Sequence, residues 1–174
     1  MSFALMLMAT ATLPGQAAQT SDPIAPAASG MLQCYVPNVA KHVCQSLAGY
    51  RKRPDGSYDN TATVMLSPSP LVIMQTVTTV TVDAGSVCGT IQEQDIDAAV
   101  ISVNGQTLSD TDAAAVRSRI ETGLALLLGK RICTTYVPDG AQLVAKATID
   151  GEPQPAMDQK VIWVAPSDGF QVGP

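Results

Sequence analysis

Aromatic and charged residues are both scarce in this chain of 174 residues, at 4% and 14% of the total. Lysine and arginine together number 10 against 15 acidic residues, which gives a formal net charge of −5. Proteins that bind nucleic acid through its phosphates carry an excess of positive charge, so this balance argues against a nucleic-acid partner. Because 46% of the residues are hydrophobic, the composition also excludes a wholly disordered chain.

Motifs that carry catalysis or hold cofactors are missing as well. The sequence has a single histidine, His42, and it has no Gly-x-Ser-x-Gly elbow, no glycine-rich phosphate loop and no Cys-x-x-Cys pair. The cysteines nearest His42, Cys34 and Cys44, do not have the paired spacing that is usual for zinc ligands. We therefore predict no catalytic residue, no cofactor and no metal ion, and we leave open whether the protein is an enzyme.

No apolar run is long enough to span a membrane, and the first residues resemble an export signal instead. An uncharged apolar stretch of about 11 residues, from Phe3 to Leu13, has the length of a signal-peptide core. Small residues follow, which favours cleavage after Ala17 or Ala18. We predict a signal peptide over residues 1–18 and a periplasmic or secreted mature protein without a transmembrane span. The alternative is a buried N-terminal helix of a cytosolic protein.

Four cysteines lie beyond this segment, and export would expose them to an oxidising compartment. An even number of cysteines in that setting indicates disulfides. Of the three possible connectivities we favour Cys34 with Cys44, which closes a local loop, and Cys88 with Cys133, which ties the strand before a predicted helix to the strand after it. In the chain-entropy model these bridges contribute about 3 and about 4 kcal/mol.

Strand-like segments dominate the rest of the chain. Residues 71–82, LVIMQTVTTVTV, are rich in β-branched side chains and form the best strand candidate. Residues 45–50 and 58–66 flank Pro54-Asp55-Gly56, whose turn chemistry predicts a hairpin. Further strands are expected at residues 97–103, 131–137, 143–149 and 160–164.

One amphipathic helix is predicted over about residues 109–128. Ser109 has the side chain of an N-cap, and Gly129 follows the last apolar position. Spacings of three and four residues place four apolar side chains on one stripe: Val116, Ile120, Leu124 and Leu127. A helix inserted among antiparallel strands predicts an α+β fold, in which a mainly antiparallel sheet carries this helix on one face and two disulfides support it.

We expect a single α+β domain over residues 31–165. Residues 19–30 are rich in proline, alanine and serine and predict a flexible leader. Residues 166–174 begin with a polar sequence that contains proline and glycine, and they predict a disordered tail.

These observations favour a non-enzymatic binding or interaction module of the periplasm or cell exterior. Its partner is an unidentified envelope component, either a protein or part of the cell wall. The tip of the predicted hairpin is the expected contact surface, because the only basic run of the chain lies there between tyrosines. This surface consists of Tyr50, Arg51, Lys52, Arg53 and Tyr58.

Two alternative functions remain at this point. A carboxylate-dependent hydrolase requires two acidic side chains that face each other in a pocket. Its candidates are Asp95, Asp97, Asp110 and Asp112. A structural envelope component would instead self-associate through the edge strand of its sheet.

Overall fold

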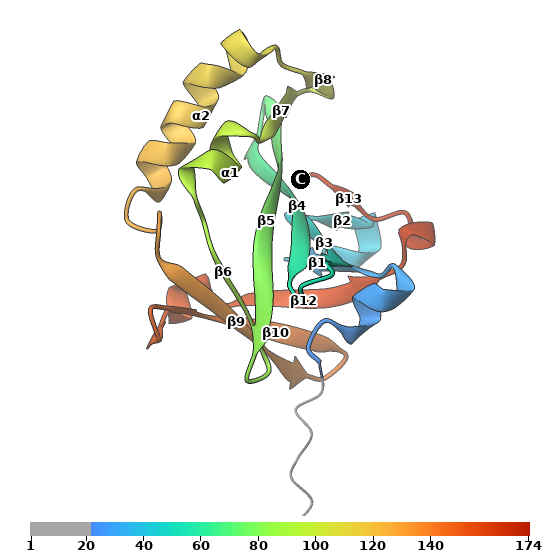
Figure 1. The fold of residues 1–174 in the computed structure, drawn as a ribbon. Coiled ribbons are helices and arrows are strands. Elements are labelled where there is room, and N and C mark those ends of the chain that lie inside the picture. The colour runs from blue at the N-terminus through green and yellow to red at the C-terminus, as the bar shows by residue number, and fades with distance from the viewer. Residues whose placement is uncertain (1–21) are drawn as a thin grey trace, which may run out of the picture.

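The computed structural model describes residues 22–174, and its main feature is a closed barrel of antiparallel strands (Figure 1). The barrel strands are β1 (Leu32–Tyr35), β3 (Ser46–Lys52), β4 (Tyr58–Pro68), β5 (Leu71–Asp83), β6 (Ser86–Thr90), β9 (Arg131–Asp139), β10 (Gln142–Ile149) and β12 (Gln159–Val164). They follow one another in the order β4-β3-β1-β12-β10-β9-β6-β5, and β5 pairs back with β4 to close the ring. Each of the eight strands therefore has a neighbour on both sides.

The strand β5 shows how the sequence alternation builds the barrel wall. Its residues Met74, Thr76, Thr78 and Val80 face the interior, whereas Val77 points outward with 51% of its surface exposed. Successive side chains of a strand point to opposite faces, and β-branched residues suit such a half-buried position. The same long strand supplies both the inner lining and the outer surface.

The predicted α+β fold is wrong, because the strands close into a barrel instead of forming a sheet with one face covered by the helix. The predicted helix exists as α2 (Asp110–Leu124), but it ends at Leu124 and lies outside the barrel (Figure 1). Its start agrees with the prediction, since the Ser109 hydroxyl accepts a hydrogen bond from the Asp112 amide at 3.2 Å. The side chains of Val116 and Ile120 pack on a small cluster around Ile101, so the expected packing on a sheet face is absent.

This helix belongs to an excursion that leaves the barrel after β6 and returns at β9. The excursion contains α1 (Glu93–Asp97), β7 (Val100–Val103), β8 (Gln106–Thr107) and α2. Strand β6 pairs with β5 from Val80 to Asp83, and β7 pairs with β5 from Val72 to Gln75. Residues 76–79 of β5 pair with neither strand. The α1 helix borders this gap, where the Thr76 hydroxyl donates to the Asp95 carbonyl at 3.0 Å.

Both favoured disulfides are present. Cys34–Cys44 joins β1 to the short strand β2 (Val43–Cys44), and Cys88–Cys133 joins residues that face each other in the β6–β9 pairing. No cysteine within residues 22–174 is free. Two disulfides are typical of proteins that fold in an oxidising compartment.

The two flanks of the barrel, for which the sequence predicts a flexible leader and a disordered tail, contain short elements in the structure. Ile24 is only 1% exposed and belongs to a core cluster, and it is followed by the 3-10 helix η1 (Ala25–Ser29). At the other end β13 (Gln171–Val172) pairs in parallel with β2, and Phe170 stacks on His42 at 4.9 Å between ring centroids. A buried side chain thus anchors the first flank, and backbone pairing together with Phe170 anchors the second. The predicted signal peptide over residues 1–18 lies outside the described residues.

The remaining elements are short. They are η2 (Val39–Lys41), β11 (Glu152–Pro153), η3 (Pro155–Met157) and η4 (Pro166–Asp168). Among the helices that the structure describes, none has both the length and the apolar character needed to cross a membrane.

Candidate binding cavity

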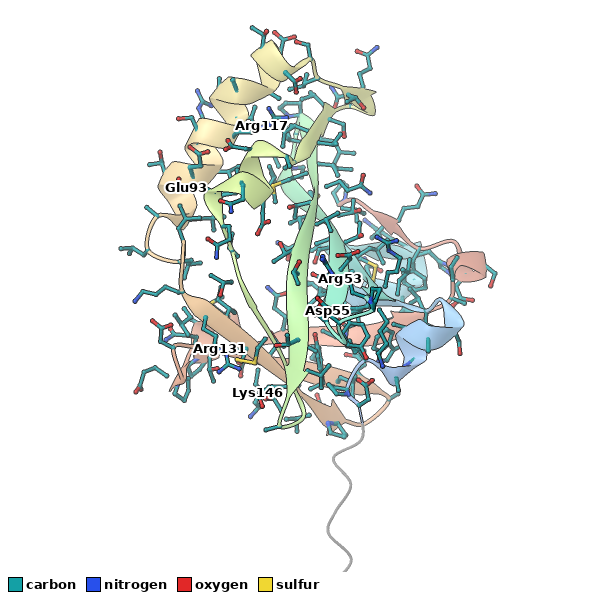
Figure 2. The ribbon with its side chains drawn as sticks, in the orientation of Figure 1. Arg53, Asp55, Glu93, Arg117, Arg131 and Lys146 are labelled. Atoms are coloured by element: carbon teal, nitrogen blue, oxygen red, sulfur yellow. A yellow bond between two sulfur atoms is a disulfide. The ribbon has the colours of Figure 1, made fainter. Side chains whose placement is uncertain are left out.

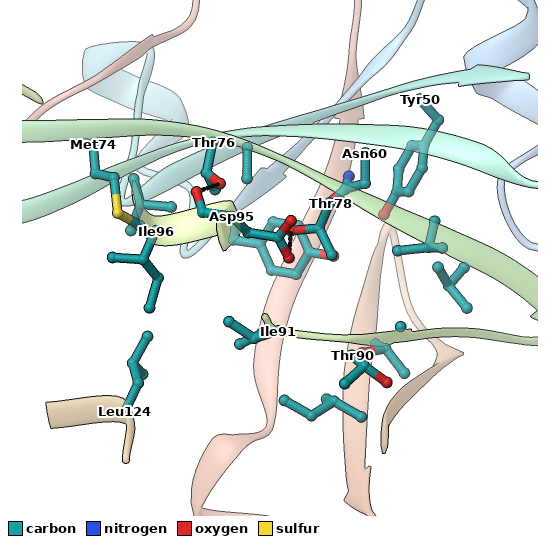
Figure 3. A pocket seen from close by; sticks show the side chains of 18 of the residues that line it. Tyr50, Asn60, Met74, Thr76, Thr78, Thr90, Ile91, Asp95, Ile96 and Leu124 are labelled. Atoms are coloured by element: carbon teal, nitrogen blue, oxygen red, sulfur yellow. Dashed lines mark hydrogen bonds between the residues drawn. The ribbon is translucent and has the colours of Figure 1, made fainter. Parts of the chain in front are cut away.

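The barrel interior contains a cavity of about 300 Å³ (Figure 3). Its lining comes from the inward faces of the strands, from α1 and from Leu124 at the end of α2. The volume lies at the lower end of the range of roughly 300–1,000 Å³ that is usual for small-molecule sites. Small lining residues such as Ala62 leave this space open.

Three tyrosine hydroxyls meet at one side of the cavity around a buried glutamine amide. The hydroxyl oxygens of Tyr35, Tyr50 and Tyr136 lie 3.0, 2.7 and 3.1 Å from Oε1 of Gln33, to which they donate. The hydroxyls of Tyr35 and Tyr136 are also 2.7 Å apart. Gln33 has no exposed surface, and its Nε2 has no hydrogen-bond partner within the described part of the chain.

Two phenols of this tyrosine cluster (Gln33, Tyr35, Tyr50 and Tyr136) are held in their neutral form. Burial raises the pKa of Tyr35 and of Tyr50 well above the ordinary value of 10, and repulsion between the neighbouring phenols adds to the effect. These two side chains therefore stay protonated beyond the pH at which a free tyrosine ionises.

We expect alkaline pH to destabilise the protein through these tyrosines. In the unfolded chain Tyr35 and Tyr50 ionise near pH 10, whereas in the folded barrel their raised pKa keeps them protonated. Their contribution to stability is complete below about pH 10 and is lost as the pH rises through the folded pKa. Over that interval the free energy of unfolding should fall by up to about 2.7 kcal/mol per pH unit for the two protons.

Urea denaturation at a series of alkaline pH values measures this slope, and tyrosinate absorbance reports ionisation directly. A double variant, Tyr35→Phe with Tyr50→Phe, serves as the control and should flatten the slope. If the part of the tyrosinate absorbance that the double variant lacks appeared with an ordinary pKa in a protein that is still folded, the expectation would be contradicted.

Asp95 is the only acidic or basic residue that lines the cavity. It lies on α1 beside the gap in the wall, where its Oδ2 accepts hydrogen bonds from the Gln92 amide at 3.1 Å and from the Thr78 hydroxyl at 3.5 Å (Figure 3). Within residues 22–174 it forms no ion pair. Asp95, Gly89 and Thr90 also line a depression on the outer side of the wall, so the interior and the surface approach each other at this point.

The other charged side chains belong to the outside of the molecule. Arg53, Arg131 and Lys146 are exposed (Figure 2). Arg117, also labelled there, donates to the Ala99 carbonyl at 2.9 Å, in the contact between α2 and the rest of the excursion. The cavity therefore combines apolar walls, a neutral polar cluster and one carboxylate.

The residues of the hairpin tip, which the sequence predicted as one contact surface, lie on different faces of the barrel wall in the structure. Tyr50 points into the barrel, while Arg51 and Arg53 both pair with Asp59, at 2.6 and 3.0 Å. The Lys52 ammonium lies 5.9 Å from the centre of the Tyr58 ring. The exposed part of this tip is formed by its basic residues alone, and its contact with a partner stays a prediction.

The four acidic residues of the hydrolase hypothesis are not brought together. Only Asp95 lines the cavity, and Asp97 is exposed on the same helix. Asp110 pairs with Arg117 at 3.3 Å, and Asp112 accepts a hydrogen bond from the Ser109 hydroxyl at 2.6 Å. In the described part of the chain no three His, Cys, Asp or Glu side chains are grouped so that they would hold a metal ion.

Sequence reasoning missed the tyrosine cluster. Gln33 and Tyr35 alternate with Cys34 on β1 and thus share a face, but Tyr136 is 103 residues away from Gln33 in the chain. Only the closed barrel brings these side chains together.

The fold and the cavity define a closed antiparallel β-barrel with an internal cavity. In comparisons with known proteins, the chain matches no protein-family model, no curated protein and no solved structure.

Proposed function

We propose that this protein is a non-enzymatic binding protein that encloses one small, mainly apolar molecule in its barrel. The observation that supports the proposal is the cavity of about 300 Å³ inside the eight-stranded ring. The interior of a barrel of this size is either filled by side chains or left open for one small ligand. Here alanine and threonine stand at several inward positions where larger side chains would fill the space.

The lining indicates how the ligand would be oriented. Met74, Ile96 and Leu124 form an apolar region next to the helices, whereas Tyr50 of the tyrosine cluster lies farther along the barrel (Figure 3). Ligand pockets are typically apolar with a few placed polar groups that fix orientation. We therefore propose a ligand with a hydrocarbon body and a limited number of hydrogen-bonding groups.

We propose further that the protein acts in the periplasm or outside the cell. The apolar first residues and the two disulfides support this location, because disulfides persist in oxidising compartments. Carriage of a small molecule in the envelope is a binding role and needs no catalytic residue.

Filling the cavity should abolish binding while the fold is kept. Ala62 lines the cavity from β4, so Ala62→Phe places a ring in the ligand space. With octanol as the probe, we expect calorimetric titration to show binding at least about tenfold weaker than in the unmodified protein. The melting temperature should change little, because the new ring occupies space that is already open.

The matched control is Val77→Phe on the neighbouring strand, which adds a ring to the outward face. Val77 is 51% exposed, so octanol affinity should stay unchanged. Equal octanol affinity in Ala62→Phe and the unmodified protein would show that the cavity is not the binding site. Absence of octanol binding to the unmodified protein would also count against the proposal.

A further inference from the structure

Most side-chain hydrogen-bond donors that line the cavity already donate to acceptors within the protein. The three hydroxyls of the tyrosine cluster donate to Gln33, and Asn60 donates its Nδ2 to the Gly49 carbonyl at 3.2 Å. Thr76 and Thr78 both donate to oxygens of Asp95. Among the lining side chains of residues 22–174, the hydroxyls of Thr90 and Thr134 and the second N–H of Asn60 have no such partner.

Acceptors, in contrast, remain available on the same surface. Nδ2 of Asn60 donates to the Gly49 carbonyl, and the side-chain oxygen of Asn60 remains an acceptor. The phenolic oxygens of the tyrosine cluster also keep lone pairs that can accept. Oδ1 of Asp95 has no hydrogen-bond partner within residues 22–174, since both side-chain contacts of this carboxylate use Oδ2. The cavity thus offers acceptors to whatever enters it.

The charge of the lining residues also favours a ligand that donates hydrogen bonds. Asp95 contributes one negative charge, and no lysine or arginine side chain lines the cavity to balance it. A ligand carboxylate or phosphate placed here would face a like charge without a cationic partner. A ligand cation would instead form a charge-assisted hydrogen bond, which is about twice as strong as a neutral one.

We propose that the ligand is an amphiphile with a protonated amine, whose ammonium group pairs with Asp95 while its hydrocarbon body lies in the cavity. An ammonium carries three donors and no acceptor, which complements a surface rich in acceptors. Asp95 stands where the interior approaches the outer surface, so the charged group stays close to water while the apolar part is enclosed. This inference rests on the proposed binding function and specifies the ligand class for the same cavity.

Three probes with one tail and different head groups test the inference on the unmodified protein: octylammonium, octanol and octanoate. At neutral pH we expect octylammonium to bind about tenfold more tightly than octanol, and octanoate to bind most weakly. Equal affinity for octylammonium and octanol, or tightest binding of octanoate, would overturn the inference and leave the proposed binding function standing. If none of the three binds, the proposed function fails together with the inference.

The variant Asp95→Asn tests the residue itself. Its side-chain carbonyl still accepts the Gln92 amide and so keeps the contact at the start of α1, but the negative charge is gone. Octylammonium should lose its roughly tenfold preference over octanol, so that the two probes bind alike, and an unchanged melting temperature reports that the barrel is folded. Asp97→Asn removes an equal charge from the same helix outside the cavity and should keep the preference. A preference that persists in Asp95→Asn would contradict the assignment to Asp95.

Discussion

Replacement of both Cys88 and Cys133 by serine should lower the free energy of unfolding by about 4 kcal/mol. The two cysteines are 45 residues apart, and in the chain-entropy model a cross-link that closes a loop of this length contributes roughly that amount. The closed loop holds the whole excursion with α1, β7, β8 and α2. Folded domains are stable by only about 5–15 kcal/mol, so this loss is a large fraction of the total.

The measurement is urea denaturation of the double serine variant under non-reducing conditions, compared with the unmodified protein. The matched control is the double serine variant at Cys34 and Cys44, which are 10 residues apart, so its expected loss is smaller, at about 3 kcal/mol. A larger loss at the local bridge than at Cys88–Cys133 would show that loop closure does not decide the effect.

The same bridge also stabilises the edge of the binding cavity. Cys88 and Cys133 join β6 to β9 near the points where the excursion leaves and rejoins the barrel. Asp95 and Leu124, which line the cavity, both belong to this excursion. The disulfide therefore lies at the base of the excursion that borders the gap in the wall.

Local features of the fold were predictable from the sequence. The β-branched run at residues 71–82 forms β5, and the turn at Pro54-Asp55-Gly56 connects β3 to β4 as the hairpin pattern indicated. Ser109 caps α2 because its hydroxyl accepts a hydrogen bond from the amide of Asp112, which follows closely in the sequence. Each of these features depends on residues within a few positions of one another.

Barrel closure was not predictable in this way. It depends on β5 having β4 on one side and both β6 and β7 on the other, which is a matter of pairing between distant segments. The apolar stripe of the helix indicated a buried face, but it did not say which element covers that face. In the structure Val116 and Ile120 contact the excursion, whereas Leu124 reaches the cavity.

The candidate site was predictable only in its individual residues. Asp95 was a candidate because it is a carboxylate close to Asp97 in the sequence. In the structure the two carboxylates do not form a pair, since only Asp95 lines the cavity. Tyr50 and Arg51 are adjacent in the sequence but point to opposite faces of β3, so one lies inside the barrel and the other outside. The sequence pattern did not identify Gln33 as a buried residue, because a polar residue that faces the barrel interior alternates with its neighbours in the same way as one that faces water.

Substitution of Gln33 by leucine should lower the free energy of unfolding by about 2 to 4 kcal/mol. Leucine is apolar and of similar size, but it removes the oxygen that accepts from the three tyrosine hydroxyls. Each unpaired buried hydroxyl costs about 1–3 kcal/mol, and the loss is partly offset because the unpartnered Nε2 of Gln33 disappears as well. The hydroxyls of Tyr35 and Tyr136, 2.7 Å apart, can still bond to each other, so two donors against one lose their partner. The net destabilisation is measured by urea denaturation. Gln75→Leu on the exposed face of β5 is the control and should change stability by less than about 0.5 kcal/mol.

A double-mutant cycle separates the cluster from simple packing. If Gln33 acts by accepting from the hydroxyls, Tyr35→Phe should cost less stability in the Gln33→Leu protein than in the unmodified protein. The expected difference is about 1 kcal/mol, because in the Gln33→Leu protein the Tyr35 hydroxyl has already lost Gln33 as its acceptor. Additive effects of the two substitutions would mean that the hydrogen bond to Gln33 contributes nothing of its own. A Gln33→Leu protein more stable than the unmodified one would show that the unpartnered Nε2 outweighs the three bonds to Oε1. In that case an apolar side chain would be the better residue at this position for stability, and the amide would be explained only by what enters the cavity.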